Sequence, residues 1–141
     1  MTYKLSQHSL NKLEGVHPLL VAVVRRAIER SEQDFSVICG VRTLEEQKDL
    51  YAQGRTRPGP IVTQTMNSKH LKQSDGYSHA VDLLPYPADW TTVGKFDAIA
   101  KAMFDAAKAL GITLRWGADW DRDGKLREAK ESDSPHFEIV R

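Results

Sequence analysis

Apolar residues recur along the chain in two patterns, one typical of helices and the other typical of short strands. Helical spacing and capping residues predict three helices, at 18–29, 44–53 and 92–110. Short β-rich apolar runs predict strands, at 35–41, 80–84, 112–116 and 136–140. A long irregular loop is expected at 55–78. Because helices and strands do not alternate regularly, the pattern predicts an α+β fold and one domain over residues 1–141.

Two of the predicted strands carry polar side chains opposite an apolar face. Side chains alternate along a strand, so Val81 and Leu83 point one way and Asp82 the other. By the same rule Phe137 and Ile139 face the core, and His136 and Glu138 point to the opposite side. Each of these strands therefore offers a possible metal ligand on its polar face.

The residues before the last strand add a second carboxylate. Pro135 has no N–H to donate, so the regular strand is expected to start at His136, with Asp133 in the preceding loop. Two histidines and one carboxylate can hold a catalytic zinc, and a further carboxylate can accept a proton from water. The spacing alone leaves two interpretations open, a metal site or unrelated polar surface residues.

The composition of the chain argues against several classes of function. Lys plus Arg is 20 and Asp plus Glu is 19, for a formal net charge of +1, which argues against a nucleic-acid-binding protein. No run is apolar enough for membrane insertion, and the start of the chain lacks a signal-peptide core. We therefore expect synthesis in the cytoplasm without a standard export signal. The single cysteine, Cys39, is expected to be a small buried apolar residue.

Four segments carry the most specific information: Gly40–Thr43 followed by Gln47, Ser68–His70 with Gly76–Asp82, Arg115–Trp120, and Asp133–Glu138. In order and spacing they resemble the motifs of the zinc D,D-carboxypeptidase and L-alanyl-D-glutamate peptidase family, most of all its phage endolysins. The resemblance implies a small Hedgehog/D,D-peptidase-like α+β domain. In that fold helices flank a short antiparallel sheet, and the metal lies in a groove.

The resemblance also implies roles for individual residues. The zinc ligands would be His70, Asp82 and His136. Asp133 would be the catalytic base, and Arg42 would lie at the substrate site.

Some assignments have alternatives. The interval from His70 to Asp82 is longer than in the usual motif, so His79 is an alternative first ligand. Gln47 belongs either to the substrate site or to the surface of its helix. His17, outside all motifs, is expected at the surface or at a helix start.

The implied function is that of a zinc-dependent metallopeptidase acting on peptidoglycan. It would cleave the L-alanyl-D-glutamate bond of the stem peptide as a phage-type endolysin. The alternatives are a D-alanyl-D-alanine carboxypeptidase and a non-catalytic zinc-binding domain. A monomer made in the host cytoplasm would need a holin-like partner to reach the cell wall.

One acidic turn suggests a further cation. Asp119, Asp121 and Asp123, followed by Gly124, match the first half of an EF-hand loop. Lys130 stands where such a loop requires a glutamate. The turn is therefore either a regulatory calcium site or a solvated acidic turn.

Overall fold

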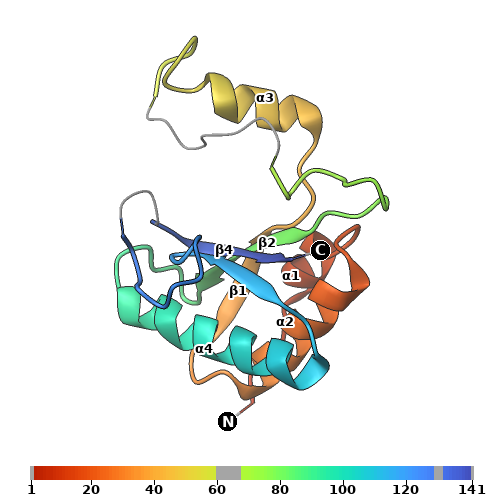
Figure 1. The fold of residues 1–141 in the computed structure, drawn as a ribbon, viewed down its shortest axis with the longest axis vertical. Coiled ribbons are helices and arrows are strands. Elements are labelled where there is room, and N and C mark those ends of the chain that lie inside the picture. The colour runs from red at the N-terminus through yellow and green to blue at the C-terminus, as the bar shows by residue number, and fades with distance from the viewer. Residues whose placement is uncertain (1, 60–67, 129–131, 141) are drawn as a thin grey trace.

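The computed structural model describes residues 2–59, 68–128 and 132–140. Four strands form one antiparallel sheet in the order β1-β2-β4-β3 (Figure 1). The strands are β1 (Phe35–Cys39), β2 (Ala80–Pro85), β3 (Leu114–Gly117) and β4 (Asp133–Ile139). The helices are α1 (Gln7–Lys12), α2 (Pro18–Arg30), α3 (Leu44–Ala52) and α4 (Val93–Leu110). The predicted α+β class with a short antiparallel sheet is confirmed.

Helices α2 and α4 pack together and cover one face of the sheet (Figure 1). Pro18 suits the first turn of α2, and Gly111 ends α4 in the left-handed conformation, at φ 72°. The apolar stripes of both helices join the inward residues of the strands in a single core. Burying each large aliphatic or aromatic side chain in such a core stabilises the fold by about 1.5–3 kcal/mol.

Helix α3 lies on the other side of the sheet (Figure 1). Its start is the predicted capping box: Thr43 Oγ1 accepts a hydrogen bond from the Glu46 amide at 3.1 Å, and Glu46 Oε1 accepts one from the Thr43 amide at 3.0 Å. Residues 40–43 connect the end of β1 to the start of α3.

The predicted elements hold to within about two residues, with two exceptions. Helix α1 was missed, because it is only six residues long and has one buried residue, Ser9. The predicted start of the last strand at His136 was wrong, since β4 begins at Asp133. The register of β3 against β4 shifts between Trp116 and Gly117, so Pro135 falls in an irregular stretch where its missing N–H is tolerated.

The parts of the expected long loop that the structure describes, 55–59 and 68–78, contain no helix or strand. Residues 60–67 of that loop lie outside the described residues. Within the described ranges, no helix combines the length and apolar character needed to span a membrane.

Candidate metal centre and active site

The sheet brings Asp82 and His136 together. The two residues are directly opposite each other in the antiparallel pairing of β2 with β4. Their strand neighbours Val81 and Phe137 belong to the core, so both polar side chains point to the face away from α2 and α4. The distance from His136 Nδ1 to Asp82 Oδ1 is 3.4 Å. The expected polar face of these strands is thus present.

His70 reaches the same carboxylate from the loop before β2. Its Nε2 lies 3.1 Å from Asp82 Oδ1, and its ring is only 2% exposed. Its Nδ1 contacts the Gly40 carbonyl at 2.8 Å. The backbone is fixed as well: Ser68 Oγ accepts the His70 amide, and the His70 carbonyl accepts the Arg42 amide. The imidazole is therefore held with one nitrogen toward Asp82.

His136 is held in a similar way by a residue of its own strand. Its Nε2 lies 2.8 Å from Glu138 Oε1, and Glu138 is itself buried. The indole of Trp120 packs against the ring, with centroids 5.0 Å apart. With Nε2 bonded to a carboxylate, Nδ1 is left facing Asp82. Glu138 was placed on this face from the sequence, but no role was assigned to it.

The electrostatics of this group favour positive charge. Burial opposes protonation of His70, but the adjacent Asp82 carboxylate outweighs it and raises the pKa of His70 to about 10. The pKa of His136 is also raised: burial opposes this, and hydrogen bonds to Asp82 and Glu138 overcome it. Burial would raise the pKa of Asp82, yet the two histidines hold it well below its usual range.

Asp133 lies at the edge of this group. The sequence placed Asp133 in the loop before the last strand; it is instead the first residue of β4 and pairs with Gly117. Its Oδ2 is 4.0 Å from His136 Nδ1, and its side chain is 54% exposed. Partial desolvation, and then the nearby Asp82 charge, raise the pKa of Asp133. A carboxyl with a raised pKa beside a cation site is suited to proton transfer.

Gly117 explains part of the motif around residues 115–120. A Cβ at Gly117 would collide with the backbone carbonyl of Asp133. Trp116 is buried against Phe137 in a stacked arrangement, and its Nε1 donates to the Ser134 carbonyl at 2.6 Å. These residues therefore fix where β4 begins.

Arg42 and Gln47 lie together beside the histidines. Arg42 Nη1 donates to Gln47 Oε1 at 2.8 Å, and Gln47 is fully buried although it lies on the short helix α3. The buried position excludes the helix-surface interpretation of Gln47. The Arg42 guanidinium is half-buried and also faces the Cys39 sulfur at 3.7 Å.

Cys39 is not the buried apolar residue that the sequence suggested. It is half-buried, and Sγ lies 3.6 Å from His70 Nδ1. Burial opposes ionisation of the thiol, but the His70 contact outweighs it and lowers the pKa of Cys39. Ligand atoms of Cys39, His70 and Asp82 lie within 4.8 Å of one another and could hold a metal ion. This half of the candidate centre carries no motif signal, because a lone cysteine in a strand is usually a packing residue.

The acidic turn also gathers its carboxylates. Ligand oxygens of Asp119, Asp121 and Asp123 lie within 4.8 Å of one another. Asp119 accepts the amides of Asp123 and Gly124, which closes the turn. Lys130, at the position where an EF-hand loop requires a glutamate, lies outside the described residues. The calcium site stays a prediction.

His79 lies apart from the other predicted ligands. Its Nε2 contacts Asp75 Oδ2 at 2.7 Å rather than Asp82. His17, expected at the surface or at a helix start, is the N-cap of α2, but its ring is largely buried against Tyr77 and His79. His8 is exposed on α1.

The chain is similar to known proteins over its whole length. A model of the phage L-alanyl-D-glutamate peptidase family matches residues 1–140. The L-alanyl-D-glutamate peptidase of Escherichia phage T5 is 35% identical over 146 residues, covering 99% of this chain and all of that protein. The Bacillus subtilis peptidoglycan L-alanyl-D-glutamate endopeptidase CwlK is 28% identical over 152 residues, covering 94% of this chain and 82% of that protein. The crystal structure of the Serratia marcescens L-Ala D-Glu endopeptidase ChiX superposes with a TM-score of 0.75 at 30% identity, covering 97% and 90% of the two chains.

Proposed function

The chain belongs to the phage L-alanyl-D-glutamate peptidase family, and on that premise we propose that it is a zinc-dependent endolysin. It cleaves the bond between L-alanine and D-glutamate in the peptidoglycan stem peptide. The observation that carries the proposal is the approach of His70 Nε2 and His136 Nδ1 to one oxygen of Asp82, at 3.1 and 3.4 Å, with the Asp133 carboxyl 4.0 Å from His136 Nδ1.

In this proposal His70 Nε2, Asp82 and His136 Nδ1 hold the zinc. Two imidazole nitrogens and one carboxylate oxygen are a usual donor set for catalytic zinc. Both histidines fit, because the nitrogen that faces away from Asp82 already has a fixed acceptor, the Gly40 carbonyl or Glu138. When bound, zinc supplies a Lewis acid that polarises a carbonyl and lowers the pKa of water.

His136 fits this ligand set better than Cys39 does. The Cys39 sulfur approaches His70 at Nδ1, the nitrogen that also contacts the Gly40 carbonyl. Nε2, the nitrogen facing Asp82, is on the other side of the ring. We therefore assign Cys39 to the surroundings of the centre, where it packs against His70 and the Arg42 guanidinium.

Asp133 acts as the general base. Its half-exposed carboxyl can reach both solvent and the position between the histidines, and its raised pKa lets it hold a proton after accepting one from water. The same group then gives that proton to the amine that leaves.

Arg42 binds the substrate. Its Nη1 is fixed by the buried amide oxygen of Gln47, so the guanidinium is positioned before substrate arrives. A planar guanidinium suits a stem-peptide carboxylate or the charge that develops on the scissile carbonyl oxygen. Gln47 serves as the positioning residue for Arg42.

The wider biology is part of the same proposal. The protein is one domain and a monomer, made in the host cytoplasm. It reaches the wall when a holin-like partner opens the membrane. The similarity to a phage enzyme over the full chain supports this setting.

Product analysis tests the bond. Purified stem peptides are incubated with the protein and zinc, and the products are identified by mass spectrometry. We expect free L-alanine or a muramyl-L-alanine fragment together with a peptide that begins at D-glutamate. Release of terminal D-alanine alone would instead identify a carboxypeptidase.

A further inference from the structure

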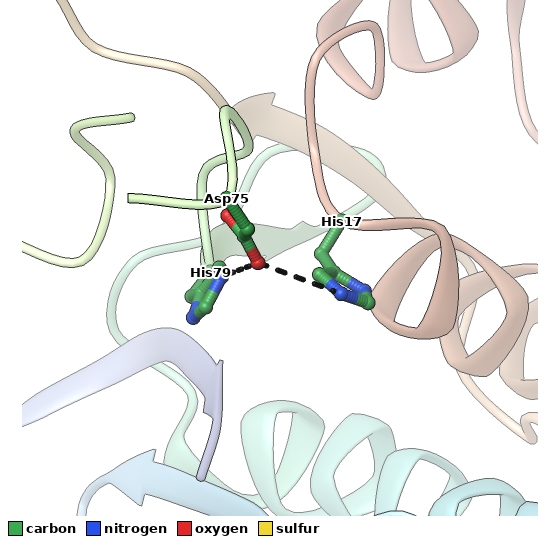
Figure 2. Close-up of side chains that lie close together, drawn as sticks. All are labelled: His17, Asp75 and His79. Carbon is green, nitrogen blue, oxygen red and sulfur yellow. Dashed lines mark hydrogen bonds and ion pairs between the residues drawn. The ribbon is translucent and has the colours of Figure 1, made fainter. Parts of the chain in front are cut away.

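A second cluster of metal-binding side chains lies apart from the candidate active site. His79 Nε2 is 2.7 Å from Asp75 Oδ2, and His17 Nε2 is 3.7 Å from the same oxygen. The two rings are nearly perpendicular, at 88°, with centroids 5.4 Å apart. Figure 2 shows both imidazoles directed at one carboxylate oxygen, one ring from the start of α2 and the other from the segment before β2.

The backbone holds the three side chains in place. The amide of His17 donates to the Ser78 carbonyl at 2.9 Å, and the amide of His79 donates to the Lys69 carbonyl at 2.8 Å. Asp75 Oδ1 accepts the Tyr77 amide, which leaves Oδ2 directed at the histidines. The arrangement therefore exists before any ion binds.

The cluster is shielded but reachable. The side chains of His17 and His79 are 13% and 10% exposed, whereas that of Asp75 is 37% exposed. An ion can therefore approach from solvent on the side of the exposed Asp75 carboxylate and bind between two largely buried imidazole rings.

We propose that His17, Asp75 and His79 form a second zinc site, independent of the active site. Their ligand atoms all lie within 4.8 Å of one another. Two imidazole nitrogens and one carboxylate oxygen, completed by water, form a set that zinc accepts. A zinc ion here joins the start of α2 to the segment 68–79, which carries His70. Its role is to fasten that segment to the helical layer.

Helix capping limits the affinity of this site. His17 Nδ1 accepts the Leu19 amide at 3.1 Å, so the metal-free neutral ring carries its proton on Nε2, toward Asp75. Zinc takes the Nε2 lone pair, and the ring proton moves to Nδ1, where it faces the Leu19 N–H. The cap is then lost, which weakens binding by about fivefold relative to an uncapped histidine. Zinc at this site thus leaves a signature at the Leu19 amide.

Zinc titration of the full-length protein tests the proposal. We expect two equivalents for the wild type by calorimetry and elemental analysis. His17→Asn removes the imidazole but keeps a residue that caps helices well, so it should fold normally and bind one equivalent fewer. Asp75→Asn, at a more exposed position, should also lose that equivalent. His70→Ala should keep it.

Nuclear magnetic resonance gives a readout that does not involve activity. Adding zinc to His70→Ala should shift the Leu19 amide and move the ring proton of His17 from Nε2 to Nδ1. The proposal is overturned if no zinc equivalent is lost in His17→Asn and Asp75→Asn, or if the Leu19 amide does not respond. If only the active-site assignment is wrong, His70→Ala will bind as much zinc as the wild type, and His17→Asn will still bind less.

Discussion

Glu138 offers the sharpest single perturbation of the candidate metal centre. Its Oε1 lies 2.8 Å from His136 Nε2, its side chain is 8% exposed, and its Oε2 is 3.9 Å from Arg115 Nη1. By accepting from Nε2, Glu138 holds the His136 proton there and leaves Nδ1 available toward Asp82. Glu138→Gln keeps the size of the side chain and removes the charge that fixes this tautomer.

Loss of such an outer partner costs 10–100-fold in metal affinity in comparable sites, which is about 1.4–2.7 kcal/mol. We expect Glu138→Gln to bind zinc at the active site within that range of weakening. The new amide can also donate to the ring, which would put the proton on Nδ1 and block the ligand position. The loss should therefore lie toward the upper end.

Competition with a chromogenic chelator measures the affinity. Glu29→Gln on α2 is the matched control, because it removes the same charge from an exposed position. Cobalt substitution adds a visible spectrum that reports on the ligands directly. If Glu138→Gln binds zinc within twofold of Glu29→Gln and gives the wild-type cobalt spectrum, the tautomer argument is wrong.

Three further predictions concern substrate binding, the position of the base and acid stability. Arg42→Lys should lower kcat/KM for stem peptides by about 10–100-fold, which corresponds to the loss of one charged hydrogen bond, and should leave the zinc content unchanged. If the variant and the wild type have equal kcat/KM, Arg42 does not bind the substrate. Gly117→Ala should displace the start of β4, because its Cβ meets the Asp133 carbonyl, and should cost about 100-fold in kcat while zinc stays bound. A variant with normal kcat would show that this contact does not position the base. The ion pair with Lys95, and then backbone amides, hold the pKa of Asp89 below its usual range. Asp89 therefore stabilises the folded protein above about pH 4, and this stabilisation is lost as the pH falls through the pKa that Asp89 has in the folded state. Asp89→Asn should therefore lower the melting temperature at pH 7, with a gap to the wild type that narrows in acid; a gap of constant size would contradict this assignment.

The elements of the fold were largely predictable because they depend on local patterns. The capping box at Thr43 and the apolar stripe of α4 each depend only on residues close together in the sequence. The alternation in β2 was sufficient to place Asp82 on the polar face. The start of β4 was not predictable, because the shift that accommodates Pro135 arises from pairing with Gly117 on another strand.

The candidate sites show the same division. The residues with a motif signal, such as His70 and His136, could be assigned roles from their resemblance to a family. Cys39 and Glu138 could not, because their importance comes from single contacts with those histidines. The approach of His17 to Asp75 depends on the packing of the chain start against a distant loop, and no local pattern encodes it.

In the proposed mechanism Asp133 activates water at a zinc centre without holding the metal. The most direct measurement compares the wild type with Asp133→Ala for zinc content and for lysis of outer-membrane-permeabilised cells. We expect equal zinc content, with clearing of the cell suspension by the wild type only. Equal clearing by both proteins, or a loss of zinc from the variant, would contradict the proposed role of Asp133.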